Sequence, residues 1–275
     1  MTNKLRTLGL LACSGLLFAA SPVFAQGVIL GSKHDFTSTG SAQQTTTLTD
    51  EVCVFCHTPH GADTNAPVPL WNKVITTRSF NRYSTLSTPT FDSQEAPVGS
   101  VSLACLSCHD GVQAMDVVLN APGSGLGTGQ IDPGAISAMT GTPIPVVASA
   151  GDATPFDLSN DHPVSMQYGG GGATAGDPVG TFTGTLGDPD FRDPVKAELN
   201  GQSIWWVDSA GGTTGTREKT DMLLYTRSDL GTAEPFVECG SCHDPHNGAN
   251  AAGTQVSFLR TSNAASAVCT ACHTK

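Results

Sequence analysis

Residues 53–60 read CVFCHTPH, with a histidine directly after the second cysteine and another histidine three positions later. The five-residue pattern C-x-x-C-H occurs four times, as CVFCH at 53–57 (motif I), CLSCH at 105–109 (motif II), CGSCH at 239–243 (motif III) and CTACH at 269–273 (motif IV). Positions i and i+3 lie on one face of a helical turn, so both thiols of a motif can reach the same edge of a bound group. The histidine beside them then points at its centre. This pattern is the attachment signature of c-type haem.

The cysteines could instead form disulfides or zinc sites. Neither alternative explains a histidine after every second cysteine, and the intervals between the motifs exceed the common zinc spacings. The sequence therefore predicts four covalent haem c groups. The cysteines predicted to form the thioether bonds are Cys53, Cys56, Cys105, Cys108, Cys239, Cys242, Cys269 and Cys272.

The histidine count matches the number of axial positions on four haem irons. Four of the eight histidines lie in the motifs, which leaves four others for the opposite faces. The predicted axial ligands are His57, His109, His243 and His273 from the motifs, and His34, His60, His162 and His246 from elsewhere. Methionine is the main competing ligand. Since no methionine has a repeated context, we expect Met115, Met139, Met166 and Met222 to be packing residues.

The second histidine of CVFCHTPH cannot bind the same iron as the first, because the free axial position lies across the macrocycle. The proline between them ends any helix, so His60 should point towards a second haem. We expect His60 to serve the haem of motif II. His246, in the twin stretch CHDPH, should serve the haem of motif IV.

An iron with imidazoles on both faces has no open position for a substrate, so the sequence predicts an electron relay. No catalytic residue is assigned and the chain is expected not to be an enzyme. The alternative is a multihaem reductase, which requires one iron with a vacant or weakly held sixth position.

The first 25 residues predict export. Lys4 and Arg6 precede an apolar run, and VFA ends at Ala25, as in a secretory signal peptide. Cleavage before Cys13, as in a lipoprotein, is the alternative. The expected location is extracellular or at the cell surface, with the periplasm as alternative. The formal net charge of −11 argues against nucleic acid or anionic lipid as partner, and no later segment is apolar enough to span a membrane.

The composition predicts little regular structure. Charged residues make up 13% and aromatic residues 6% of the chain, which also holds 31 glycines and 17 prolines. We expect a mostly irregular chain wrapped around four stacked haems, with short α-helices at the motifs and a minor β-hairpin within 203–228. The predicted organisation is a signal peptide, 1–25, and a single tetrahaem domain, 26–275. This domain would consist of a first haem pair at 26–115, a Gly/Pro-rich insertion with the hairpin at 116–230, and a second haem pair at 231–275.

Local signals add detail to this scheme. Thr49 or Asp50 could cap a helix through motif I, and a second helix should cover motif II and stop at Gly111. Trp71 and Tyr83 are expected to pack against haem.

The chain resembles exported multihaem cytochromes with doubled C-x-x-C-H motifs, and more closely the tetrahaem extracellular cytochromes of the OmcE type, which polymerise into conductive filaments. The stretches that carry the resemblance are GSKHDF (31–36), NAPVPLWN (65–72), YSTLSTPTFDS (83–93), CLSCHDGV (105–112), SNDHPVS (159–165) and CGSCHDPHN (239–247).

The resemblance implies bis-histidine haems in a continuous stack, self-association into filaments, and other redox proteins or extracellular electron acceptors as partners. It also implies that His34, near the N-terminus, could be donated to a neighbouring subunit; the alternative is that His34 ligates a haem of its own chain. A soluble periplasmic tetrahaem shuttle, which donates electrons to a reductase, is the second functional expectation.

Overall fold

The computed structural model describes residues 29–42, 44–47, 49–86, 93–110, 118–121, 140–141, 157–159, 161–209, 212–227, 230–247 and 258–275. The expected signal peptide, the expected helix stop at Gly111, and Met115 and Met139 lie outside these residues. Within the described part, no helix is long and apolar enough to cross a membrane.

A six-stranded antiparallel sheet, in the order β3-β8-β7-β6-β5-β4, dominates the structure. The expectation of a mostly irregular chain with a minor hairpin is therefore wrong. The expected hairpin is real, as β6 and β7, but these are two inner strands of a larger sheet. The strands are β3 (Met166–Gln167), β4 (Gly180–Thr181), β5 (Val195–Leu199), β6 (Gln202–Val207), β7 (Met222–Arg227) and β8 (Thr232–Val237).

The turn between β5 and β6 has a local cause. Asn200 and Gly201 have φ values of 51° and 76°, and Leu199 pairs with Gln202 across the turn. Asn-Gly is the preferred pair for a two-residue hairpin turn, in which both central residues have positive φ. The strands that it joins carry β-branched and aromatic residues, which favour a pleated and half-buried surface.

The largest hydrophobic core lies on this sheet. Trp205, Val207, Met222 and Leu224 from β6 and β7 belong to it, together with Met166 from β3. Burial of Met166 and Met222 confirms that these two methionines pack in the interior. Two motif cysteines, one from motif III and one from motif IV, pack against the same core. The core on the sheet thus supports motifs III and IV through packing with one cysteine of each motif.

The helices are short and follow the motifs. Motif II ends α1 (Ser100–His109), which confirms the second expected helix, motif III begins α2 (Cys239–Cys242), and the first half of motif IV lies in α3 (Ala267–Thr270). Motif I has one turn rather than a helix, closed by a 2.8 Å hydrogen bond from the His57 amide to the Cys53 carbonyl. The smaller elements are β1 (Gln44–Thr45), β2 (Thr140–Gly141), η1 (Tyr83–Leu86), η3 (Tyr168–Gly170) and η5 (Ala264–Ser266).

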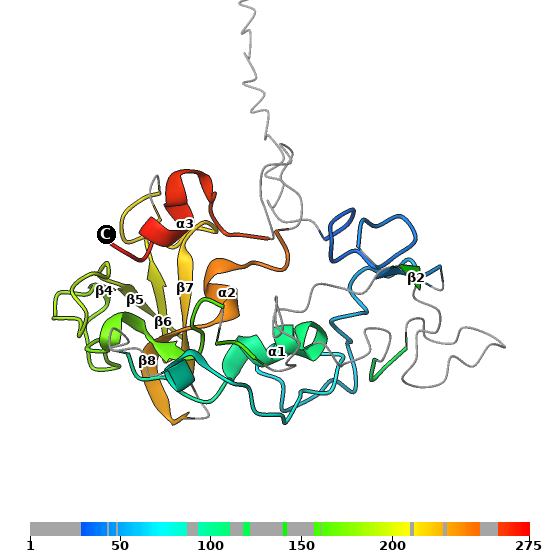
Figure 1. Cartoon of the computed structure of the whole chain (residues 1–275), viewed down its shortest axis with the longest axis horizontal. Coiled ribbons are helices and arrows are strands. Elements are labelled where there is room, and N and C mark those ends of the chain that lie inside the picture. Colours follow the sequence, from blue (N-terminus) through cyan, green and yellow to red (C-terminus); the bar gives the residue numbers. More distant parts are fainter. Residues whose placement is uncertain are drawn as a thin grey trace, which may run out of the picture.

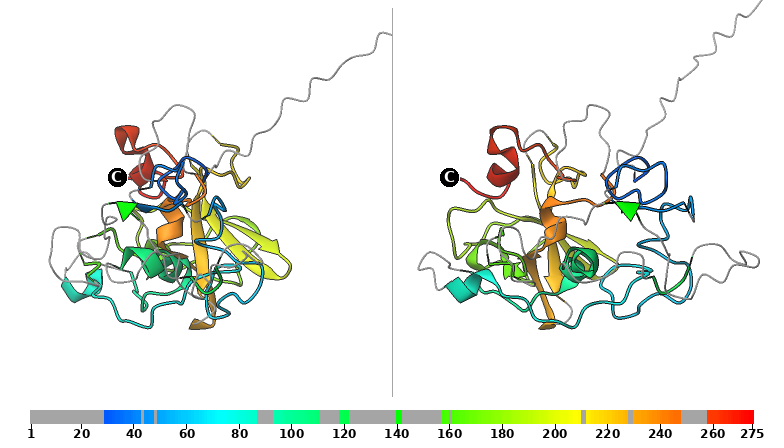
Figure 2. Two further views of the ribbon diagram at one scale, coloured as in Figure 1. Left: turned by 90° about the vertical axis from the view of Figure 1, so that its right-hand side faces the viewer. Right: turned by 45° about the vertical axis from the view of Figure 1, so that its right-hand side comes forward.

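The motifs lie between two parts of the molecule. Figure 1 shows the sheet on one side and the N-terminal loops, in blue, on the other, with α1 and α2 in between. The 45° view of Figure 2 keeps this arrangement, whereas in the 90° view the blue loops face the viewer; in both views α3, in red, lies near the top of the molecule. The helices α1 and α2 bring motifs II and III together although these motifs are far apart in sequence.

Candidate haem-binding sites

All eight motif cysteines are free thiols in the structure. Among the described residues, no group of three or more His, Cys, Asp or Glu side chains could hold a metal ion by itself. The structure thus shows neither the disulfides nor the zinc sites that the sequence left as alternatives.

Sulfur atoms of successive motifs lie close together. Burial raises the pKa of Cys56 in motif I to about 12, and the neighbouring Cys108 of motif II adds to this shift. The thiol of Cys105, also in motif II, shares a hydrogen bond with Cys239 of motif III, and this bond raises the pKa of Cys105.

The third link joins motifs III and IV. Burial raises the pKa of Cys272 to about 12, and the charge of Cys242 contributes in the same direction. Motifs II and III each use one cysteine towards the preceding motif and the other towards the following one. Each motif therefore neighbours the next in the order I, II, III, IV.

Within the part of the chain that the structure describes, the motif histidines His57, His109 and His273 each face a histidine from elsewhere in the chain. The ring centres of His57 and His246 are 6.2 Å apart, with 15° between the ring planes. Those of His34 and His109 are 6.2 Å apart at 53°.

The third pair is His162 and His273, with ring centres 6.5 Å apart and 63° between the planes. Each imidazole nitrogen lies about 2 Å from a metal that it binds, so two imidazoles on opposite faces of one ion have centres about 6 Å apart. All three separations are close to this value. The residues present therefore fit a haem iron between each pair of rings.

These pairs differ from the expected assignments. His246 faces motif I rather than motif IV, which has His162 instead, and motif II has His34 rather than His60. His60 is exposed, and the described structure records no ring contact for it. His34 faces His109 of its own chain, which favours the second of the two alternatives that the resemblance left open.

Aromatic rings hold three of these histidines in place. Trp71 is buried and meets His57 edge-on, with 5.8 Å between ring centres, which agrees with a packing role beside motif I. Phe258 stacks on His34 at 4.1 Å, and Phe191 lies 4.4 Å from His273. Such contacts fix the direction of an imidazole at low entropic cost.

The electrostatics of the distal histidines also suit metal ligands. Burial first, and then the charge of His109, lowers the pKa of His34 to about 4, and burial lowers that of His162. A neutral imidazole is the form that binds metal. His246 differs, because its hydrogen bond to Asp244 raises its pKa. A carboxylate behind a ligating imidazole orients the ring and strengthens it as a ligand.

A buried polar network joins the helices of motifs II and III. The Ser102 hydroxyl in α1 donates a 2.6 Å hydrogen bond to Glu238, and the Cys239 amide donates one of 3.0 Å to Ser102. Arg227 forms a fully buried ion pair with Glu238 at 3.3 Å. Burial nevertheless raises the pKa of Glu238 to about 7. The sequence gives no signal for this network, because its members come from three separate segments.

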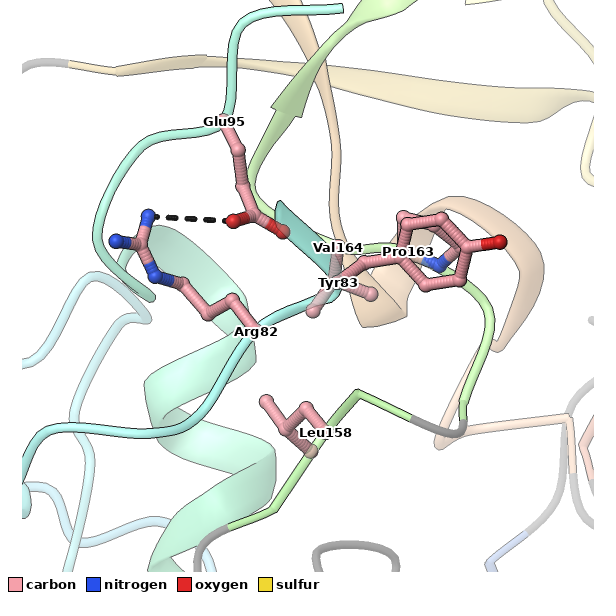
Figure 3. Close-up of a pocket in the computed structure, with 6 residues that line it drawn as sticks. All are labelled: Arg82, Tyr83, Glu95, Leu158, Pro163 and Val164. Atoms are coloured by element: carbon pink, nitrogen blue, oxygen red, sulfur yellow. Dashed lines mark ion pairs between the residues drawn. The ribbon is translucent and has the colours of Figure 1, made fainter. Parts of the chain in front are cut away.

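A small surface pocket lies beside the segment that carries His162. Figure 3 shows Arg82 and Glu95 facing each other across it, at a distance of 3.5 Å. Its other lining residues are Tyr83, Leu158, Pro163 and Val164. Because the two charged groups in the pocket are paired with each other, we assign the pocket no catalytic role. Tyr83, expected to pack on haem, lines this pocket.

Comparison with known protein families finds that residues 234–275 match the family described as "Doubled CXXCH motif". This segment contains motifs III and IV. A comparison with curated proteins finds no match. The chain therefore carries a doubled haem-attachment motif of the kind found in multihaem c-type cytochromes, which indicates covalently bound haem c and electron transfer.

Proposed function

We propose that the protein is a tetrahaem cytochrome that passes electrons along four bis-histidine haem c groups. The order in which the motifs neighbour one another, I, II, III, IV, carries this proposal. Cys56 of motif I packs against the cluster that contains Ala104 of α1, the Cys239 amide of motif III donates a 3.0 Å hydrogen bond to Ser102 of α1, and Cys242 and Cys272 pack against one core. Bound haem c supplies a one-electron couple at each motif, and electron transfer requires that neighbouring couples lie close together.

The protein side chains would hold each group. The two cysteines of a motif would form its thioether bonds, and the motif histidine would ligate the iron. His246, His34 and His162 would supply the second imidazole at motifs I, II and IV, which the ring separations support.

The histidine count assigns the last ligand. His60 is the one distal histidine not used at motifs I, II and IV, so it serves motif III, from the same chain or from a neighbouring copy. This completes an exchange: the histidine after motif III serves motif I, and the histidine after motif I serves motif III. Two imidazoles on every iron leave no position for a substrate, and we propose no catalytic activity.

We further propose that the protein is exported and functions outside the cell, as a subunit of a conductive filament or in contact with extracellular acceptors. The predicted leader and the resemblance to filament-forming cytochromes support this. The alternative is a soluble periplasmic shuttle, with the same haems but reversible docking to a redox partner.

One preparation tests these points. The mass of the secreted, haem-loaded protein is measured by mass spectrometry. Its haem absorption spectrum is then recorded with and without carbon monoxide. We expect the mass of four haems and a low-spin spectrum that carbon monoxide leaves unchanged. Fewer haems, or a component that binds carbon monoxide, would contradict the relay. Electron microscopy of the same material separates the alternatives, since monodisperse particles would exclude the filament and leave the shuttle.

A further inference from the structure

Three motifs share a backbone arrangement that their sequences do not reveal. At motif I, His57 forms an antiparallel bridge with Trp71. The amide of Thr58 donates to the Leu70 carbonyl at 2.9 Å, and the amide of Asn72 donates to the Cys56 carbonyl at 2.8 Å. The short extended segment Leu70–Asn72 thus forms backbone hydrogen bonds with the residues before and after His57.

Motifs III and IV repeat this arrangement. His243 bridges Leu259, and His273 bridges Phe191. The residue after each bridge partner donates its amide to the second cysteine of the motif: Arg260 to Cys242 and Arg192 to Cys272, each at 2.8 Å. The pairing segment follows the motif in the chain at I and III and precedes it at IV, so this is a repeat in space and not in sequence.

The same three residues also bind the motif through their side chains. Asn72 Nδ2 donates to the carbonyl of Val54 at 2.7 Å. Arg260 Nε donates to that of Gly240 at 2.9 Å, and Arg192 Nε to that of Thr270 at 2.7 Å. In each case the acceptor is the residue directly after the first cysteine. At each of these three motifs, one residue therefore holds two carbonyls, one near the start of the motif and one just before its histidine.

We propose that Asn72, Arg260 and Arg192 are positioning residues that clamp motifs I, III and IV in the conformation that accepts haem. The helical turns at these motifs are very short: α2 and α3 have four residues each. Such turns do not persist alone, because their nucleation fixes several dihedral angles for one hydrogen bond. The clamp supplies the missing hydrogen bonds. Motif II lies at the end of the ten-residue helix α1 and is held by the helix itself.

The clamp has a consequence for each haem separately. When both carbonyls are held, the two thiols and the imidazole keep the relative directions that thioether formation and iron ligation require. Without the clamp residue, only its own motif should lose this order. The inference rests on the proposed haem binding, and occupancy can be measured motif by motif.

The test uses full-length, secreted holoprotein with Arg192→Ala or Asn72→Asp, which keeps the shape of the side chain but removes its donor. Digestion and mass spectrometry then give the haem occupancy of each motif. We expect a several-fold loss at motif IV for Arg192→Ala and at motif I for Asn72→Asp, with the other motifs fully loaded. Arg217→Ala, which removes an exposed arginine elsewhere, is the control for the change of charge.

A second readout distinguishes a clamp from general support of the fold. In the molecules that keep haem at motif IV, the electron paramagnetic resonance signal of that iron should change in Arg192→Ala. Unchanged occupancy and an unchanged signal would overturn the inference, even if the melting temperature falls. Should Arg192→Ala fail to accumulate, Arg192→Gln, which is shorter but retains a donor, replaces it with the same expected pattern. Haem missing from all motifs of the unaltered protein would instead refute the proposed function.

Discussion

The centres of the imidazole rings of His246 and His57 lie 6.2 Å apart, with 15° between the ring planes, although the two residues come from opposite halves of the chain. The other two histidine pairs have planes tilted by 53° and 63°. In a low-spin ferric haem, the angle between the two axial imidazole planes governs how the iron orbitals split. The pair at motif I should therefore differ from the pairs at motifs II and IV in its magnetic resonance spectrum.

This difference predicts the effect of His246→Ala. Removal of this imidazole should abolish the near-parallel, rhombic component of the spectrum that belongs to motif I. A high-spin component that binds carbon monoxide should replace it, because one axial position becomes free. His34→Ala is the matched variant and should remove a strongly tilted component instead. A rhombic component from motif I that survives in His246→Ala would refute the assignment of this ligand.

The contact between α1 and α2 depends on Gly240 having no side chain. A Cβ at this position would meet the Tyr225 hydroxyl, and it would come within 3.0 Å of Val101 Cγ2 in α1. Gly240→Ala should therefore push motif III away from motif II and cost roughly 1–3 kcal/mol of stability, the usual range for overpacking. Thermal unfolding of the holoprotein measures this.

Gly176→Ala serves as the control, since the nearest atom to its Cβ would be 3.7 Å away. Because Gly240 lies between two attachment points, its variant should also slow electron exchange between the haems of motifs II and III. Equal melting temperatures for the two variants would show that the helices do not pack as closely as described.

Glu238 predicts a dependence of stability on pH. Its pKa is about 7 in the folded protein, raised from 4.5 mainly by burial, while Ser102 and Arg227 act in the opposite direction. Between these two values the folded state binds more protons than the unfolded state. The free energy of unfolding must then fall as the pH rises from about 4.5 to 7. At 1.36 kcal/mol for each pKa unit, the fall amounts to about 3 kcal/mol at most.

Glu238→Gln should remove this slope, since the amide does not ionise in the window. The measurement is a series of denaturant titrations of the holoprotein between pH 4.5 and 8. Glu51→Gln, at an exposed position, should keep the slope. If Glu238→Gln retained the full slope, other groups would have to account for the pH dependence.

The sequence predicts the attachment chemistry well and the fold poorly. The attachment motifs depend on residues that are close in the sequence, whereas the fold depends on contacts between distant ones. A C-x-x-C-H motif and the helix over motif II depend on neighbouring residues only. The β6–β7 hairpin also has a local pattern. The strand β8 contains Pro235, and a proline within a run lowers the expectation of a strand. Asn200–Gly201 is a local signal for the turn between β5 and β6.

The distal histidines could be listed but not paired from sequence. The sequence predicts that His60 and His246 reach the next motif along the chain, because neither can bind the opposite face of its own motif's haem. The sheet between motifs II and III, however, returns the chain so that motif III lies beside motif II, and His246 meets His57. Similarly, the segment that bridges motif IV lies far upstream, at Phe191. Such relationships depend on tertiary packing.

The sheet core predicts a link between packing and haem potential. Trp205 is 1% exposed and belongs to the core against which Cys242 and Cys272 pack. Trp205→Ala should cost roughly 3–5 kcal/mol, as for other large-to-small core substitutions. It should also admit water beneath motifs III and IV, and solvent access is one of the factors that set haem potential. Potentiometric titration should therefore show shifts confined to two of the four haems.

Leu199→Ala, at a residue that is 60% exposed on β5, should change neither stability nor potentials. A uniform shift of all four potentials in Trp205→Ala would mean that the sheet acts on the whole relay and not on motifs III and IV.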